Sequence, residues 1–160
     1  MAKMRNRQLT IIDACEVSGY NRDQLKGLLK KLPQFTERAT LPRVARKFTP
    51  QEIAVLRVIF ILEDHIGINR SKTISVATLL SKALSGPKKI GKNARLFISF
   101  DPISVHYDEK GRPDHDGVIL SLGTIFERVD QYLMPSNISR QADLKLGPML
   151  VTNEAKKSVA

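Results

Sequence analysis

Arg46–Gly67, RKFTPQEIAVLRVIFILEDHIG, is the stretch that decides the fold. Thr49 and Glu52 have the spacing of a capping box, and Pro50 between them suits the first position of a helix. Apolar residues then recur at steps of three and four, the period of one helical face: Ile53, Leu56, Ile59, Phe60 and Ile66. A second apolar set covers much of the remaining surface: Val55, Val58, Ile61 and Leu62. We therefore predict a core helix buried nearly all round, ended by Gly67.

The length of 160 residues suits one domain or two small ones, and 42% hydrophobic residues can form a core. No run reaches the roughly 18 uncharged apolar residues that a membrane span requires. The N-terminal segment MAKMRNRQ lacks the apolar region of a signal peptide. We therefore expect a cytoplasmic protein that does not associate with membranes. The lone cysteine, Cys15, excludes an intrachain disulfide and any multi-thiolate metal site.

The net charge of +10 is unevenly distributed along the chain. Residues 1–50 hold 11 Lys/Arg against 4 Asp/Glu, and residues 81–100 hold 5 bases and no acid. Residues 101–143 hold 4 bases against 8 acids. This distribution indicates a polyanion-binding face in the N-terminal third, beside an acidic section that does not contact the polyanion. The alternative is a basic protein whose charges are simply solvated.

Two short helices are predicted before the central helix. The first, within Leu9–Gly19, is capped by Thr10, ends at Gly19, and places Ile11, Ala14 and Cys15 on one face. The second is opened by Asn21 with Gln24 three residues later, runs roughly over 22–31, and turns four leucines inward: Leu25, Leu28, Leu29 and Leu32. Two short helices joined by a glycine-containing turn are typical of a helix-turn-helix. An ordinary helical hairpin fits the pattern equally well.

The segment Pro33–Lys47 is predicted to form a β-hairpin loop, because its few apolar residues are separated by polar and basic ones. A basic hairpin after a helix-turn-helix is typical of a wing, whose arginines reach phosphates or the minor groove. A solvated loop is the alternative.

Beyond the central helix, Asn69 can cap a helix over about 71–84, with Ile74, Ala77, Leu80 and Leu84 on one face and Gly86-Pro87 as its stop.

The hydrophobic period changes from 3.6 to 2 at Leu96. Alternation predicts strands at 96–100, 103–107 and 118–122, followed by a short helix that Pro135 ends. The fold class is therefore α+β: a mainly helical N-terminal winged helix-turn-helix followed by a small β-rich unit with one packing helix. The predicted division is a flexible basic arm (1–8), the helix-turn-helix domain (9–86), a basic linker (87–95), a dimerisation or docking module (96–135) and a flexible tail (136–160).

Residues 9–84 resemble the N-terminal winged-helix domain of the MerR family of transcription regulators. The resemblance lies in an Ile…Ala-Cys…Gly-Tyr helix and turn, the segment Asn21–Lys26 that opens the second helix, and the step Arg46-Lys47-Phe48-Thr49. It continues through Glu52-Ile53…Leu56…Ile59…Leu62…Gly67-Ile68. Two features depart from the family: Gly27 and Leu28 stand where aromatic residues are usual, and a β-rich segment replaces the long dimerisation helix.

The resemblance implies that the second helix enters the DNA major groove. It assigns base or phosphate contacts to Asn21, Arg22, Gln24 and Lys26, with Lys26 at a phosphate, and a backbone contact to Arg46. Lys30 lies on the outer face of the same helix, and Arg38, Arg43 and Lys47 are phosphate candidates by charge and place alone. The alternative for all of them is an ordinary charged surface.

An enzyme is not predicted. Asp108, Asp114, His115 and Asp116 cluster with Asp101 and His106 nearby, but the spacing fits no metal loop, and Gly111 and Pro113 suit a solvated turn. No metal or cofactor is expected.

We predict a dimeric protein that binds double-stranded DNA, most simply a transcription regulator. A protein partner that binds the C-terminal module is also considered. The alternatives are an excisionase-like recombination directionality factor, a DNA-segregation or architectural protein and, in another class, an RNA-binding or ribosome-associated protein.

Overall fold

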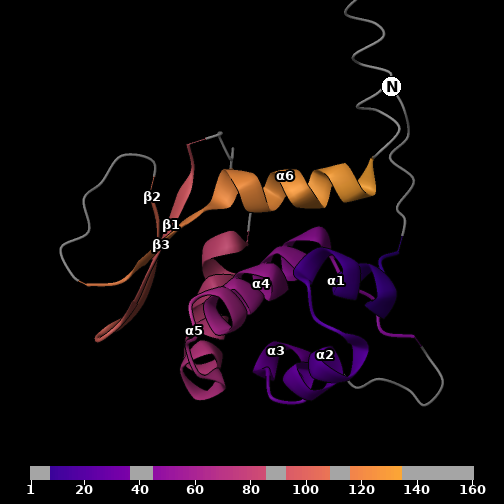
Figure 1. Cartoon of the computed structure of the whole chain (residues 1–160), viewed down its shortest axis with the longest axis horizontal. Coiled ribbons are helices and arrows are strands. Elements are labelled where there is room, and N and C mark those ends of the chain that lie inside the picture. Colours follow the sequence, from indigo (N-terminus) through magenta and orange to yellow (C-terminus); the bar gives the residue numbers. More distant parts are fainter. Residues whose placement is uncertain (1–7, 37–44, 86–92, 109–115, 135–160) are drawn as a thin grey trace, which may run out of the picture. The chain divides into compact units, whose positions relative to one another are not determined.

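Helix α4 (Pro50–Phe60) is the central helix of the computed structural model, which describes residues 8–36, 45–85, 93–108 and 116–134 (Figure 1). Its start has the predicted capping box: the Thr49 hydroxyl accepts the Glu52 N–H at 3.2 Å, and the Glu52 carboxylate accepts the Thr49 N–H at 3.1 Å. As predicted, it is buried nearly all round, through Ile53, Ala54, Val55, Leu56, Val58 and Ile59. Helices α1 and α5 both pack against it.

The helix does not continue in α form to Gly67. A π-helical segment, η1 (Ile61–His65), follows α4, and the Ile66 N–H bonds to the Ile61 carbonyl at 3.1 Å. Gly67 then ends it with φ of 82°, as predicted. The wider π turn breaks the 3.6-residue period, so Ile66, predicted on the apolar face, is 44% exposed.

Helices α1 (Ile11–Ser18) and α2 (Arg22–Leu29) precede α4 and are joined by a short turn. Gly19 ends α1 with φ of 100°, a left-handed conformation that favours glycine. Asn21 begins α2 by accepting the Gln24 N–H at 2.8 Å. The leucines predicted to face inward are all buried: Leu25, Leu28, Leu29 and Leu32.

The inward face of α1 differs from the prediction. Ala14 is buried, but Ile11 and Cys15 are only half-buried, because α1 turns Val17 and Ser18 toward its neighbours instead. Burial raises the pKa of the Cys15 thiol, more than the nearby Arg22 cation lowers it. The thiol form is therefore favoured.

The hairpin predicted over Pro33–Lys47 is wrong at its start. Pro33–Thr36 form a short helix, α3, in which the N–H groups of Phe35 and Thr36 bond to the Leu32 carbonyl at 3.0 and 3.1 Å. Phe35 is buried, with its ring centroid 5.9 Å from that of Phe48. This tertiary contact stabilises the turn. Residues 37–44 of the predicted wing lie outside the described residues.

Helix α5 (Arg70–Leu84) starts as predicted at Asn69, whose side chain accepts the Lys72 N–H at 3.0 Å. The buried residues of its predicted face are Ala77, Leu80 and Leu84, whereas Ile74 is half-buried. Thr73 and Val76 are also buried, because α5 packs on α4 on one side and on two strands on the other.

The three predicted strands form an antiparallel sheet in the order β2-β1-β3. They are β1 (Arg95–Phe100), β2 (Ile103–Asp108) and β3 (Val118–Ser121). In the register, Ile98 faces Val105 on β2, and Phe97 faces Ile119 on β3. The alternation along β1 does not separate a buried from an exposed face, since Leu96 to Ser99 are all buried. Helix α5 packs on β1 and β2, and the Gly117 backbone lies against the Phe97 ring.

Helix α6 (Leu122–Leu133) follows β3 directly and buries Leu122, Ile125 and Val129. The chain divides into two units after Val129. Of the second unit the structure describes residues 130–134, in which the Met134 N–H bonds to the Asp130 carbonyl at 2.9 Å. The fold class is thus mixed helix and antiparallel sheet, as predicted at the α+β level.

Several predicted segments lie largely or wholly outside the described residues: the basic arm, the basic linker, the acidic loop after Asp108 and the C-terminal tail. Within the described part of the chain, no helix is both long and apolar enough to cross a membrane.

Candidate nucleic-acid interface

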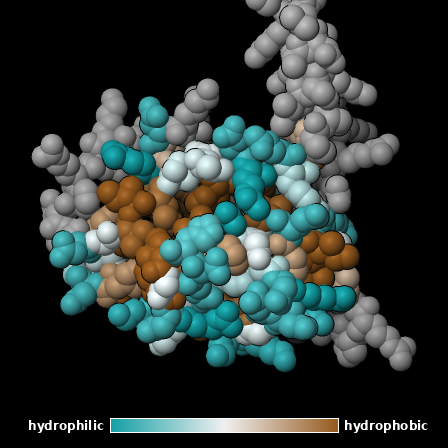
Figure 2. Space-filling model, viewed as in Figure 1, coloured by the Kyte–Doolittle hydropathy of each residue, from teal (hydrophilic) through white to brown (hydrophobic). Residues whose placement is uncertain are grey.

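Helix α2 and its two caps present all five residues predicted for the recognition helix. Asn21, Arg22, Gln24, Lys26 and Lys30 are exposed, while the leucines of the opposite side are buried. In the view of Figure 2, hydrophilic residues cover the region where Figure 1 places α2. The structure therefore presents these side chains to solvent around the part of a short helix that does not face the core.

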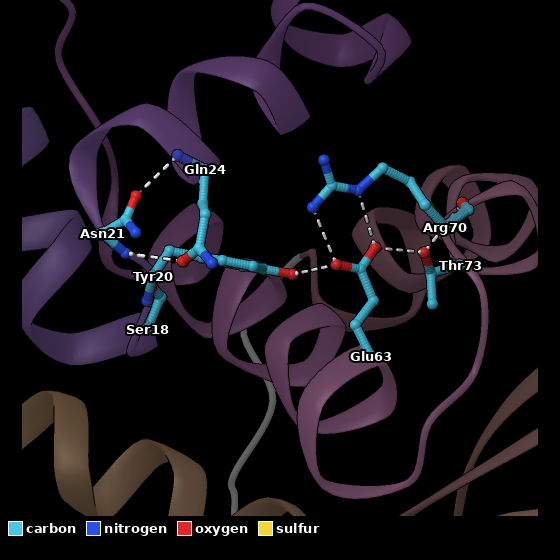
Figure 3. A network of polar contacts seen from close by, with 7 residues as sticks. All are labelled: Ser18, Tyr20, Asn21, Gln24, Glu63, Arg70 and Thr73. Carbon is cyan, nitrogen blue, oxygen red and sulfur yellow. Dashed lines mark hydrogen bonds and ion pairs between the residues drawn. The ribbon is translucent and has the colours of Figure 1, made fainter.

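Asn21 and Gln24 also hold the start of α2. The Asn21 side-chain oxygen accepts the Gln24 N–H at 2.8 Å, and the Gln24 side-chain oxygen accepts the Asn21 N–H at 3.1 Å (Figure 3). These reciprocal bonds form a capping box. Because both side-chain oxygens are used, the amide NH₂ groups are the part of each side chain that suits hydrogen bonds to a ligand.

The turn before α2 is fixed by a buried tyrosine. Tyr20 is 5% exposed, and its hydroxyl donates to the Glu63 carboxylate in η1 at 2.9 Å (Figure 3). Its ring lies edge-on to that of Phe60, with centroids 5.0 Å apart. Burial is the main cause that raises the pKa of Tyr20, and the hydrogen bond to Glu63 adds to it. Tyr20 therefore stays protonated and keeps donating to Glu63.

Glu63 is the centre of this network. Its carboxylate accepts Arg70 Nε and Nη2 at 3.2 and 3.0 Å and the Thr73 hydroxyl at 2.8 Å. Burial alone raises the pKa of Glu63, but the hydrogen bonds from Arg70, Thr73 and Tyr20 outweigh it and hold the pKa below its ordinary value. The carboxylate thus stays ionised and ties the turn before α2 to η1 and α5.

Sequence reasoning missed this network. Glu63 and Arg70 are seven residues apart and lie on either side of the helix break at Gly67, whereas helical pair rules cover steps of three and four. The available signal was Glu63 itself, an acid that directly follows the apolar run Ile59–Leu62. That signal indicates a partner without identifying it.

Two arginines meet the carbonyl end of α1. Arg57 Nη1 donates to the Ser18 carbonyl at 2.9 Å, and Arg128 Nε donates to the Val17 carbonyl at 3.1 Å. Cations suit this end of a helix, where carbonyl groups lack intrahelical partners. Burial, and then the Arg128 charge, lower the pKa of Arg57. These arginines hold α1 in place from α4 and from α6.

The predicted wing residues are placed only in part. Arg38 and Arg43 lie outside the described residues, whereas Arg46 is half-buried and Lys47 is exposed. The next residue, Phe48, donates its N–H to the Leu9 carbonyl at 2.9 Å in an isolated antiparallel bridge. Arg46 and Lys47 therefore lie beside the segment that leads into α1.

Of the acidic cluster, Asp101, His106 and Asp116 are exposed, and Asp114 and His115 lie outside the described residues. In the described ranges, no three His, Cys, Asp or Glu side chains are grouped so that they could hold a metal ion.

Comparisons of the chain with known protein families, curated proteins and solved structures found no match. The resemblance to MerR regulators therefore stays a prediction from the sequence.

Proposed function

We propose that this protein binds duplex DNA through the exposed side of α2, as a winged helix-turn-helix of the MerR kind. The observation that carries the proposal is the two-sided character of α2, which buries its leucines and presents Arg22, Lys26 and Lys30 beside two amide side chains. Asp23 is the one acid within α2. Exposed cations of this kind neutralise backbone phosphates, and amide groups hydrogen-bond to base edges.

The anchoring of α2 supports the proposal. The helix is held by its buried leucines, by the capping box and, through Tyr20, by Glu63. A helix fixed at its start keeps side chains in a constant geometry, which lowers the entropy lost when they order against a ligand.

Duplex DNA is favoured over single-stranded RNA by the position of the aromatic residues. Single-strand binding uses exposed aromatic rings on which bases stack. Near α2 the aromatic side chains serve the core instead: Tyr20, Phe35 and Phe48 are 5% exposed or less. The exposed groups of α2 are cations and amides, which suit a duplex groove and its phosphates.

The biological role that we propose is transcription regulation by a dimer in the cytoplasm. It rests on the resemblance to MerR regulators and on the concentration of positive charge in residues 1–50. The proposed wing, with Arg38, Arg43, Arg46 and Lys47, adds backbone contacts to those of α2.

The test is a titration of the full-length protein with random-sequence duplex DNA and with RNA across a salt series. Each phosphate neutralised adds about 0.9 to the log–log slope on duplex DNA. We expect steep binding to duplex DNA, with RNA well behind. Lys26→Ala should weaken binding and reduce the slope by about one, whereas Lys82→Ala, which removes an exposed cation of α5, should change neither.

Three outcomes contradict the proposal. Tighter binding to RNA than to duplex DNA assigns the protein to the RNA-binding class. Binding that does not depend on salt excludes a phosphate interface. Equal effects of Lys26→Ala and Lys82→Ala place the interface elsewhere on the protein.

A further inference from the structure

Gly27 lies within α2, where glycine is the poorest helix former after proline. Neither its backbone nor its packing requires glycine. It is not among the glycines with positive φ, and a Cβ added there would have Arg70 Nη1 as its nearest neighbour, at an ordinary contact distance of 3.9 Å. An alanine would fit without strain, so the fold does not explain this residue.

Gly27 is central to the side of α2 that we propose binds DNA. Gln24 lies three residues before it and Lys30 three residues after it, so both are its neighbours on the helix surface. Both side chains are exposed. The missing side chain at Gly27 therefore leaves a gap between two residues of the candidate interface.

Arg70 Nη1 lies at the floor of this gap. The guanidinium gives Nε and Nη2 to Glu63, and Figure 3 shows its third nitrogen directed away from that carboxylate. Nη1 takes no part in the two hydrogen bonds to Glu63, and the Arg70 side chain is 34% exposed. We call the gap at Gly27, with Nη1 at its floor, the Gly27 notch.

We propose that the Gly27 notch admits a backbone phosphate oxygen of the bound nucleic acid, which accepts a hydrogen bond from Arg70 Nη1. Glu63 positions the guanidinium by holding its other edge, so little side-chain entropy is lost when a phosphate binds. Guanidinium–phosphate hydrogen bonds are charge-assisted, short and strong. The inference rests on the proposed function and adds Arg70, from a different helix, to the interface of α2.

The test uses three variants of the full chain in fluorescence-anisotropy titrations with random-sequence duplex DNA. Gly27→Ala places a methyl group over Nη1. Arg70→Lys keeps a cation for Glu63 but removes the second edge of the guanidinium. Each should weaken binding by about tenfold, the usual effect of losing one charge-assisted hydrogen bond. If both substitutions remove the same contact, the double variant should bind DNA no more weakly than the single variant with the lower affinity.

Urea unfolding of the same variants separates this role from a structural one. Gly27→Ala should raise the unfolding midpoint, because alanine is the better helix former, while it weakens DNA binding. A lower midpoint would overturn the inference, since the glycine would then be required by the fold. Lys82→Ala serves as the control for the loss of one exposed cation from α5 and should leave both quantities unchanged.

The inference and the proposed function fail in different ways. If the wild-type protein binds duplex DNA steeply with salt but Gly27→Ala binds as tightly, the notch is not a phosphate site and the proposed function stands. Losses that multiply in the double variant would also overturn a shared contact. If the wild type does not bind duplex DNA, the proposed function fails and the inference fails with it.

Discussion

Gly19 is required at the end of α1 for two separate reasons. Its φ of 100° is one that other residues adopt at a cost, and a Cβ there would lie 2.8 Å from Phe60 Cε1. Gly19→Ala should therefore lower the free energy of unfolding by about 2–5 kcal/mol, the sum of backbone strain and overpacking. Urea denaturation followed by circular dichroism measures it.

Gly67 is the matched control for this substitution. Its φ of 82° is also positive, but a Cβ there would have nothing within 4 Å. Gly67→Ala should cost only the backbone term, about 1–2 kcal/mol. If the two substitutions cost the same, the contact between Gly19 and Phe60 contributes nothing to the choice of glycine.

Glu63 should make stability depend on pH in the acid range. Its folded-state pKa lies below the ordinary value of 4.5, so the unfolded chain binds the proton more tightly. The stability from this group is therefore complete above pH 4.5 and is lost as the pH falls through the lowered pKa. Between about pH 6 and about pH 3, the urea midpoint of the wild type should fall more than that of Glu63→Gln. Parallel pH profiles would contradict this assignment.

At the scale of elements, the helix starts were predictable because each is a local signal. Thr49, Asn21 and Asn69 each cap the helix predicted for them, through bonds to residues three positions later. The strands were predictable from their alternating period. In contrast, α3 depends on the contact of Phe35 with Phe48, and no local pattern predicts which distant ring a phenylalanine will meet.

The candidate site divides in the same way. The exposed residues of α2 are neighbours in sequence, so the period of its leucines was enough to place them. The contacts that hold α2 and its neighbour α1 join residues distant in sequence: Tyr20, before α2, and Glu63 are 43 residues apart, and Val17 of α1 and Arg128 are 111 apart. Such pairs follow from tertiary packing, which composition and spacing do not specify.

Asn21, the N-cap of α2, can be tested for a role beyond capping. Serine also caps helices, so Asn21→Ser should leave stability nearly unchanged, while Asn21→Ala should cost about 1 kcal/mol. Both variants lack the amide NH₂ group. If that group contacts a base, both should lose discrimination among DNA sequences, as measured by selection from a random pool. Loss in the alanine variant alone would show that Asn21 acts only as a cap.

At the scale of the whole molecule, the segments predicted as a helical domain and a β-rich module are in contact. Helix α5 packs on β1 and β2, and Arg128 of α6 donates to the Val17 carbonyl of α1. The composition predicts a basic linker over 87–95, between the two. A linker allows separate domains but does not require them, because contacts between the flanking elements decide whether they unfold together.

Hydrogen exchange can decide whether the elements up to Val129 unfold together. Arg128→Ala removes the bond to Val17 and should destabilise the protein by about 0.5–1 kcal/mol, a modest amount because the arginine is exposed. In one cooperative unit, the slowest-exchanging amides of α1, α4 and β1 should all lose protection by that same amount, since they exchange through one global opening. If α1 loses protection while β1 keeps it, the two segments open separately, and the contacts of α5 and Arg128 join two domains whose stabilities are independent.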